Sequence, residues 1–463
     1  MTPSVPNAVA LAPGQLARRR GRGYQLGAAL LYNLLLAVCF PLIAGYLLWR
    51  LVVQGKSRQG LRERLGSIPA DVRQRLSGGE PVVWVHAVSV GEVTAARPII
   101  RELRRREPLI HIVLSTTTPT GRAMAERGGL DVDAIVYFPL DFPFIVHRTL
   151  NVIRPRVFTT VDTEIWPNLL WMLKQRGART AIVNAKISDR SHRRSRFIRP
   201  LYAWALSNVD AICAQSSLDV ERFLALCADP AIVRAAGNAK FDEQCPQITA
   251  ARAAGLRQEL GIAPDCPVVV AGSTNPGEEG PVLDAFWRLR VAHTDARLLI
   301  APRHPERTEE VAQVVLDHGW APLRRTEMIA AGLPEASGEP PVIVLDTIGE
   351  LAEVYGIATV AFVGGSLIPK GGHNVLQPIA QGKPVLFGPH MQNQKDIAAI
   401  ALREGVAWSV ADAEELAAQF LRLVESPREL ERVAALGPQV IEKYRGASVA
   451  CAERLVELLE ATP

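Results

Sequence analysis

The sequence repeats one pattern in two series: a short run of β-branched and other apolar residues, followed by a longer segment of helical character. Runs that are apolar throughout are typical of strands buried on both faces of a parallel sheet, because the helices between them cover both faces. The chain is therefore predicted to be an α/β protein with two Rossmann-like domains. The predicted strands are residues 82–87, 111–116, 134–138, 157–161, 180–185 and 211–215, then 268–273, 297–302, 342–347, 359–365 and 383–388.

The length of 463 residues also favours two domains, because it exceeds what one hydrophobic core usually supports. The two series of predicted strands divide near residues 243–248. We expect a disordered, basic N-terminus at 1–23, a membrane-anchor helix at 24–55, an N-terminal Rossmann-like domain at 56–243 and a C-terminal one at 244–463.

The predicted anchor is an apolar run without any charged residue between Tyr24 and Trp49. It exceeds the roughly 20 apolar residues that cross a bilayer. A cleaved signal peptide is the alternative, but its apolar region usually has about 7 to 15 residues and ends at an A-x-A site, which is absent here. Asn33, Pro41 and Gly45 interrupt the run, so a tilted or partly inserted helix is a second arrangement. Arginines on both sides leave the orientation undecided.

The charge and cysteine patterns limit the binding partners and the cellular compartment that we expect for this chain. The net charge is +5, and basic residues cluster on both sides of the apolar run, where they are expected to face solvent or anionic lipid rather than nucleic acid. The six cysteines have neither C-x-x-C nor metal-ligand spacing, so we expect no metal site, a reducing compartment and the cytoplasmic side of the membrane.

Nearly every predicted strand ends in a polar or glycine-rich loop. Ligands of open α/β sheets bind outside the carboxyl ends of the strands, so these loops are expected to line one cleft between the two domains. The loops are residues 86–92, 116–121 and 162–168 in the first domain, and 272–275, 302–307, 346–350 and 361–389 in the second.

The segment 361–389 has the features of a phosphate-binding loop. A predicted strand leads into Gly364-Gly365 and Gly371-Gly372, and a short helix is predicted to begin near His373 or Asn374. Glycines allow close approach to a ligand, and the start of a helix attracts an anion. A tight turn in an ordinary α/β domain is the alternative interpretation.

Each candidate side chain has a structural alternative as well. Glu92 stands at a predicted helix start, where a carboxylate also satisfies the helix dipole. Asp162 and Glu164, two residues apart, are expected to share one face, and a helix cap is the alternative. Arg303 suits a phosphate but is otherwise a surface residue, and Lys240 at the predicted domain boundary is otherwise a solvated lysine.

The motifs VHAVSVGEV, STTTPTG, DTEIWPNL, NAKISDRS, GNAKFD, GSTNPGEE, APRHPER, DTIGEL and VGGSLIPKGGHN stand in this order between about residues 27 and 455. The chain thereby resembles the 3-deoxy-D-manno-octulosonic acid (Kdo) transferases of lipopolysaccharide assembly. The resemblance implies a GT-B glycosyltransferase attached to inner-membrane lipids and facing the cytoplasm. It implies transfer of Kdo from CMP-Kdo to a lipid A precursor (lipid IVA), without a cofactor or metal.

The resemblance also implies roles for individual residues. Glu92 is the general base, and Asp162 and Lys240 stabilise the transition state. A carboxylate suits the first role because a sugar hydroxyl is a poor nucleophile until its proton is removed, and a single displacement inverts the anomeric centre. The implied CMP site consists of Pro302, Arg303, Ile348, Gly349, Glu350, Asn374, Val375, Leu376 and Gln377.

Four residues depart from the family pattern. Asp162 replaces a glutamate, Lys186 an arginine, Asn275 a histidine and Gln377 a glutamate. We expect a working enzyme with an altered nucleotide pocket. Two other hypotheses stay open at this point: a GT-B transferase that uses another nucleotide sugar, and a membrane-anchored binding protein without catalysis.

Overall fold

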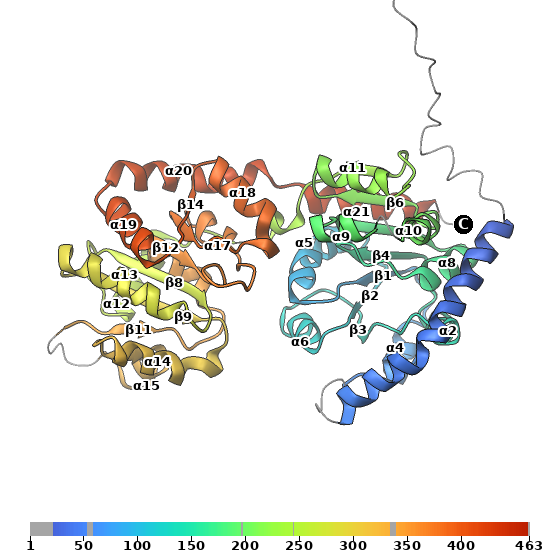
Figure 1. The fold of residues 1–463 in the computed structure, drawn as a ribbon, viewed down its shortest axis with the longest axis horizontal. Coiled ribbons are helices and arrows are strands. Elements are labelled where there is room, and N and C mark those ends of the chain that lie inside the picture. The colour runs from blue at the N-terminus through green and yellow to red at the C-terminus, as the bar shows by residue number, and fades with distance from the viewer. Residues whose placement is uncertain (1–21, 53–58, 196–197, 244, 334–338, 462–463) are drawn as a thin grey trace, which may run out of the picture. The chain divides into compact units, whose positions relative to one another are not determined.

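The structure is a computed structural model, and it describes residues 22–52, 59–195, 198–243, 245–333 and 339–461. The chain divides into two units: unit 1 is Met1–Glu243 with Tyr444–Pro463, and unit 2 is Gln244–Lys443. Each unit contains a seven-stranded parallel sheet with helices on its faces (Figure 1). The α/β class and the Rossmann-like character of both halves are therefore confirmed.

The sheet of unit 1 has the strand order β3-β2-β1-β4-β5-β6-β7. Strand order reverses beside β1, whose neighbours are β2 on one side and β4 on the other. The paired residues include His86 with Ser115 and His86 with Thr160. The strands are β1 (Val82–His86), β2 (His111–Thr116), β3 (Ala134–Tyr137), β4 (Val157–Val161), β5 (Arg179–Ala185), β6 (Ala211–Ala214) and β7 (Val233–Ala235).

Several helices of unit 1 start at a proline, which has no N–H to leave unpaired and a φ already suited to a helix. Pro119, Pro143 and Pro167 begin α6, α7 and α8. The helices of unit 1 are α2 (Arg22–Val52), α3 (Leu61–Arg64), α4 (Ala70–Arg75), α5 (Val90–Arg106), α6 (Pro119–Arg127), α7 (Pro143–Ile153), α8 (Pro167–Gln175), α9 (Asp189–Ser195), α10 (Arg199–Leu206), α11 (Ser217–Ala225), the 3₁₀ turn η1 (Ala239–Asp242) and α21 (Ala447–Glu460).

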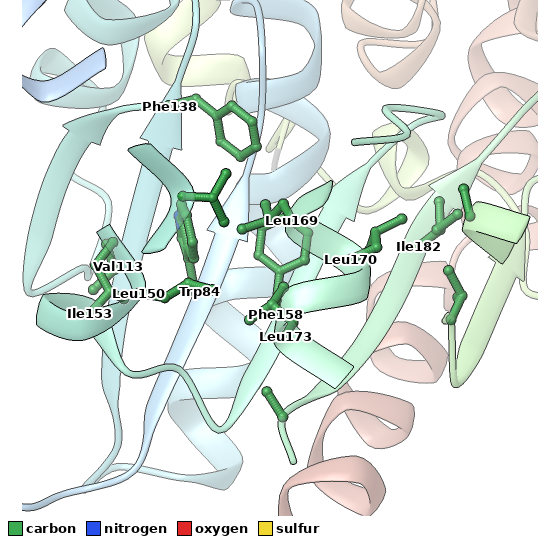
Figure 2. Close-up of a cluster of buried hydrophobic side chains, with 14 of the residues drawn as sticks. Trp84, Val113, Phe138, Leu150, Ile153, Phe158, Leu169, Leu170, Leu173 and Ile182 are labelled. Carbon is green, nitrogen blue, oxygen red and sulfur yellow. The ribbon is translucent and has the colours of Figure 1, made fainter. Parts of the chain in front are cut away.

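An aromatic cluster fills the core on one face of this sheet (Figure 2). The Trp84 ring meets the Phe158 ring edge to face, with centroids 5.1 Å apart, and lies 5.7 Å from the Phe138 ring. The Trp84 indole N–H donates to Ser115 Oγ at 2.8 Å, so the buried polar group has a partner. This packing fixes β1, β2 and β4 against one another and thereby fixes the loops that follow them.

The sheet of unit 2 has the order β10-β11-β9-β8-β12-β13-β14, and its strand order reverses beside β8. Its strands are β8 (Val268–Thr274), β9 (Arg297–Pro302), β10 (Pro322–Arg324), β11 (Val342–Val344), β12 (Val360–Val363), β13 (Val385–Phe387) and β14 (Ala407–Ser409). Its helices are α12 (Ala250–Glu259), α13 (Glu279–Ala292), η2 (Pro305–Arg307), α14 (Thr308–Asp317), α15 (Arg325–Ala331), α16 (Leu351–Val354), η3 (Tyr355–Ile357), α17 (Leu376–Ala380), η4 (Gln392–Gln394), α18 (Lys395–Arg403), α19 (Ala413–Val424) and α20 (Pro427–Lys443).

The sequence pattern misses three strands: β7, β10 and β14. Each has three residues and lies at the edge of its sheet. An edge strand is paired on one side only and is often short and polar, so it lacks the continuous apolar run by which the inner strands are recognised.

The predicted anchor, residues 24–55, corresponds to α2, which runs from Arg22 to Val52. Residues 53–55 and residues 1–21 of the predicted disordered segment lie outside the described residues, whereas residues 22 and 23 belong to α2. Within α2, Gly23–Leu42 is long and apolar enough to cross a membrane.

The predicted C-terminal domain, 244–463, is wrong at its end, because α21 belongs to unit 1. The apolar side of α21 contributes Cys451, Leu455 and Leu459 to the core on the second face of the unit 1 sheet. Its start is fixed by Asp242, whose carboxylate accepts from the backbone N–H groups of Gly446 and Ser448 at 2.7 and 2.6 Å. The periodicity of an amphipathic helix does not specify which sheet it covers.

Replacing Leu455 by alanine tests this assignment. The side chain is fully buried, so we expect Leu455→Ala to destabilise unit 1 by about 2–5 kcal/mol. Limited proteolysis followed by peptide mapping reports which unit opens first. Leu109→Ala, at a leucine that is 83% exposed, is the matched control. Faster cleavage confined to unit 2 would contradict the assignment of α21.

Candidate active site

The candidate site of unit 1 lies where its strand order reverses. β1 leads into α5, whose first turn carries Glu92, and β4 leads directly into Asp162. Because β1 and β4 pair in parallel, the loops after both strands leave the sheet at one edge and side by side. Two residues that are 70 positions apart in the sequence are thus brought together, close enough that the charge of Asp162 helps raise the pKa of Glu92.

Glu92 is a half-buried carboxylate held by its own helix start. Its Oε2 accepts from the Val88 N–H at 2.6 Å and its Oε1 from the Ser89 hydroxyl at 3.2 Å. The pKa of Glu92 is raised to about 7, mainly by burial and secondly by the negative charge of Asp162. The two hydrogen bonds act in the opposite direction and lower this pKa. A carboxylate with this pKa exchanges a proton near neutral pH, as a general base requires.

Asp162 is held in a left-handed backbone conformation, with φ of 60°. Residues other than glycine adopt this conformation at a cost of about 1 kcal/mol or more, and it is frequent at functional sites. The Asp162 Oδ1 atom accepts from Asn184 Nδ2 at 2.7 Å and from Gln215 Nε2 at 3.3 Å. Lys186 Nζ lies 3.6 Å from Asp162 Oδ2, so the lysine at this position forms an ion pair with the carboxylate.

Asn184 connects Asp162 to the turn that carries Lys240. Its side-chain oxygen accepts from the Ala239 N–H at 2.9 Å, and Ala239 begins η1. The start of η1 is also fixed by Asn238, whose side chain accepts from the Lys240 N–H at 3.1 Å. The predicted set of Glu92, Asp162 and Lys240 therefore comes from segments that meet at one edge of the sheet. Asn184 itself was not predicted, although its motif was recognised.

Glu164 adds a third carboxylate to this site. Burial, and then the charge of Asp162, raises the pKa of Glu164 to about 7. Its influence also extends to Glu92, whose pKa it helps to raise. The sequence expectation placed Asp162 and Glu164 on one face but gave Glu164 no role. Three acidic side chains in a partly buried space favour a positively charged reaction centre over an anionic one.

The candidate site of unit 2 also lies where strand order reverses, between β8 and β12. The glycine-rich segment follows β12, and the loop after β8 contributes Asn275 and Glu278. Gly364 is required by close packing, since a Cβ there would lie 2.6 Å from the Ser273 carbonyl oxygen. Gly365 has a φ of 68°, which favours glycine.

The first glycine pair is not a phosphate cradle, because it already holds an internal anion. The fully buried carboxylate of Glu278 accepts from the N–H groups of Gly365 at 2.6 Å and of Ser366 and Leu367 at 2.9 Å. It also accepts from the Asn275 N–H at 3.0 Å. The interpretation of this pair as a phosphate loop is therefore wrong.

The residues implied for CMP binding are spread over three loops of unit 2. β9 ends at the buried Pro302, and the loop after it begins with the exposed Arg303. Burial of His373 is the main cause that lowers its pKa to about 4, and the positive charge of the nearby Arg303 is the second cause. Asn275 Nδ2 is 3.0 Å from His373 Nε2, so the asparagine that departs from the family pattern contacts this histidine.

The second and third of these loops are shaped by local contacts. Ile348 is 77% exposed, Gly349 has a φ of 101°, and the Glu350 carboxylate accepts from Thr347 Oγ1 at 2.5 Å and from Arg325 Nε at 3.3 Å. In the third loop, α17 begins at Leu376, after Val375, and so starts later than predicted. Asn374 accepts from the Leu376 N–H at 2.9 Å, and Gln377 is half-buried in the first turn.

Comparison with known proteins identifies close relatives. Residues 59–243 match the model of the family described as 3-deoxy-D-manno-octulosonic-acid transferase (kdotransferase). A 3-deoxy-D-manno-octulosonic acid transferase of Haemophilus influenzae is 34% identical over 432 residues, which cover 93% of this chain and 97% of the relative. The corresponding enzyme of Bordetella pertussis is 33% identical and covers 82% of this chain, with 86% of the relative matched.

Solved structures share the fold at much lower identity. A glycosyltransferase of Rickettsia africae is 12% identical, with a TM-score of 0.56 over 83% of this chain and 99% of its own. A UDP-GlcNAc 2-epimerase of Neisseria meningitidis is also 12% identical, with a TM-score of 0.53 over 82% of this chain and 100% of its own. These likenesses extend to the fold alone, and they agree with two Rossmann-like units of the GT-B type.

Replacing Glu278 by glutamine tests the internal anion. Glutamine has one acceptor oxygen, and its NH₂ group would face N–H groups that now find a carboxylate. We therefore expect Glu278→Gln to lower the stability of unit 2 by about 2–4 kcal/mol, measured by chemical denaturation. Glu306→Gln, at an exposed glutamate, is the control and is expected to be neutral. Equal stability of the two variants would contradict the role of Glu278.

Proposed function

Because the chain belongs to the 3-deoxy-D-manno-octulosonic acid (Kdo) transferase family, we propose that it moves Kdo from CMP-Kdo to a lipid A precursor (lipid IVA). The observation that carries the proposal is Glu92, a carboxylate with a pKa of about 7 beside Asp162 at the carboxyl edge of a parallel sheet. The relative of Haemophilus influenzae, matched over almost its whole length, supports the substrate assignment.

Glu92 is the general base of the proposed reaction. An acceptor hydroxyl becomes nucleophilic as Glu92 takes its proton, while the bond between Kdo and the CMP phosphate breaks. The configuration of the anomeric carbon inverts in this single displacement. The hydrogen bonds from Val88 and Ser89 hold the carboxylate in one orientation, so little reorganisation accompanies the proton transfer.

Asp162 and Lys240 stabilise the charges that develop during transfer. The anomeric carbon gains positive charge as the leaving group departs, and a fixed carboxylate such as Asp162 favours that charge. Asn184 keeps Asp162 in place and joins it to the turn of Lys240. Aspartate is shorter than the glutamate of the family pattern by one methylene, and Lys186 forms an ion pair with it here.

We assign CMP to unit 2, at Pro302 and Arg303, at Ile348, Gly349 and Glu350, and at the segment from Asn374 to Gln377. Arg303 offers a fixed positive charge to the departing phosphate. The low pKa of His373 keeps this neighbouring imidazole neutral at pH 7, so it binds through hydrogen bonding rather than charge. Gln377 offers an amide to the ribose hydroxyls in place of the carboxylate that the family pattern has.

We also propose that α2 attaches the chain to the inner membrane, with both units on the cytoplasmic side. Support comes from the apolar stretch Gly23–Leu42 and from its exposed leucines, including Leu30, Leu34 and Leu35. A lipid acceptor is presented at the membrane surface, so attachment of the enzyme raises the rate of encounter.

The pKa of Glu92 predicts the pH dependence of transfer. A base must be ionised to accept a proton, and with a pKa of about 7 the ionised fraction rises from roughly 10% at pH 6 to roughly 90% at pH 8. The rate of transfer of labelled Kdo should therefore rise through pH 7, and Glu92→Gln should lose about 10²- to 10⁴-fold in kcat.

Two variants show which group causes this rise. Glu164→Gln removes a second carboxylate of this site with a pKa of about 7 and should keep the rise. Asp162→Asn removes the charge that opposes ionisation of Glu92, so its remaining activity should rise at a lower pH than that of the unmodified enzyme. An unchanged midpoint in Asp162→Asn, or a rise abolished by Glu164→Gln, would contradict the assignment of Glu92.

Replacing Arg303 by alanine tests the assignment of CMP to unit 2. Removing a charged donor from a phosphate costs about 1.5–3 kcal/mol, so Arg303→Ala should weaken CMP binding by about 10- to 100-fold in isothermal titration calorimetry. Arg288→Ala, at an exposed arginine of α13, should bind CMP like the unmodified protein. UDP should bind more weakly than CMP. Tighter binding of UDP would instead favour a transferase with a different donor.

A further inference from the structure

Helix α2 has two different faces. Residues at positions 25, 28, 29, 32, 33 and 36 follow the spacing of one helix face and are buried or half-buried against unit 1. This face contains the polar side chains of Gln25, Tyr32 and Asn33. The opposite face is a leucine-rich stripe, exposed by 49% to 71% at Leu26, Leu30, Leu31, Leu34, Leu35 and Val38.

The polar face is docked by specific hydrogen bonds to α10 and to the start of α8. Gln25 accepts from Trp204 Nε1 at 2.8 Å and donates to Ser207 Oγ at 3.0 Å. Asn33 and the fully buried Asn168 exchange two amide hydrogen bonds, at 2.9 and 3.0 Å. If α2 left this position, Asn168 would lose both bonds.

Tyr32 adds a link to the helix that follows the candidate site. Its hydroxyl donates to Asp141 Oδ2 at 3.1 Å, and the Asp141 carboxylate accepts from the Asn168 and Leu169 N–H groups at the start of α8. The chain segment directly before α8 carries Asp162 and Glu164. Docking of α2 therefore also supports the position of these two carboxylates.

The docked length is incompatible with a helix that crosses the bilayer. Contacts of α2 with the rest of unit 1 extend at least from Gln25 to Phe40, whose ring centroid lies 5.7 Å from that of Phe142, and this distance along the helix is about 22 Å. The part beyond Phe40 ends at Val52 and is about 18 Å long, shorter than the ~30 Å of bilayer hydrocarbon. The stretch that is long and apolar enough to cross a membrane, Gly23–Leu42, contains the docked part.

The surroundings of the exposed stripe suit a lipid surface. Phe142, which contacts Phe40, has Phe144 as its neighbour at 6.1 Å, and Phe144 is 62% exposed. Helix α10, which packs against α2, starts at the exposed Arg199, and the exposed Ile198 directly precedes it. Exposed apolar side chains match the acyl boundary of a bilayer, and an exposed arginine matches its anionic headgroups.

We propose that α2 lies in the plane of the membrane surface, with its polar face docked on unit 1 and its leucine-rich stripe in the lipid. The inference rests on the proposed membrane attachment and specifies its geometry. Unit 1 is then held at a fixed height above the headgroups, where the sugar of a lipid acceptor is presented. A membrane-spanning helix joined to unit 1 by a linker would leave that height free.

Depth-dependent quenching tests the geometry. In the full chain, with Cys39, Cys227 and Cys245 replaced by serine, a fluorophore is attached to a single introduced cysteine at position 26, 30, 34 or 38. The protein is bound to vesicles of phosphatidylethanolamine and phosphatidylglycerol that contain lipids with nitroxides at known depths. We expect one shallow depth for all four positions. Depths that differ by about 18 Å between positions 26 and 38 would show a spanning helix and overturn the proposal.

Two further results of this experiment are decisive. Protein bound to the vesicles with no quenching at any position would show that another protein surface covers the stripe, which also overturns the proposal. Absence of vesicle binding, combined with transfer activity on a detergent-dispersed acceptor, would refute membrane attachment while leaving the proposed reaction intact.

A pair of neighbouring variants separates docking from lipid contact. Asn33→Leu removes the amide pair with Asn168 and should lower Tm by about 2–8 °C without weakening vesicle binding. Leu34→Asn, one position along on the exposed face, should weaken vesicle binding without lowering Tm. For a spanning helix both variants would change insertion and neither would change Tm, and that result would contradict the proposal.

Discussion

The parallel pairing of β1 with β4 is the interaction on which the candidate active site depends. It places the loops that carry Glu92 and Asp162 side by side, and the packing of Trp84 against Phe158 holds the two strands in register. Unit 2 has the same arrangement: β8 and β12 pair in parallel, and the loops that follow them bring Asn275 into contact with His373. In both units, the strands that reverse the order of the sheet create the place where residues distant in sequence meet.

Two glutamates at these places, Glu278 and Glu92, show how the environment of a carboxylate determines whether its role is structural or chemical. Glu278 is fully buried and accepts hydrogen bonds from four backbone N–H groups, so both of its oxygens serve to hold the glycine segment. Glu92 accepts from one N–H and one hydroxyl, is half-buried, and faces the charge of Asp162. Its ionisation is opposed rather than satisfied, which raises its pKa into the range useful for proton transfer.

The inner strands were predictable because burial on both faces leaves a continuous apolar run in the sequence. The edge strands β7, β10 and β14 were not, since they have no such run, and the placement of α21 on unit 1 follows from tertiary packing that periodicity does not encode. The catalytic roles of Glu92, Asp162 and Lys240 were predicted from their motifs and stay predictions. Asn184 and Glu278 were missed because their importance lies in hydrogen bonds to distant backbone groups. The docking of Asn33 on Asn168 was missed for the same reason.

The central claim is the transfer of Kdo to a lipid A precursor, and mass spectrometry of the product tests it most directly. The full chain is incubated with CMP-Kdo and lipid IVA, alongside Glu92→Gln. The account predicts a product heavier than the acceptor by one or more Kdo residues with the unmodified chain, and unchanged acceptor with the variant. Unchanged acceptor in both reactions, or equal product in both, would contradict it.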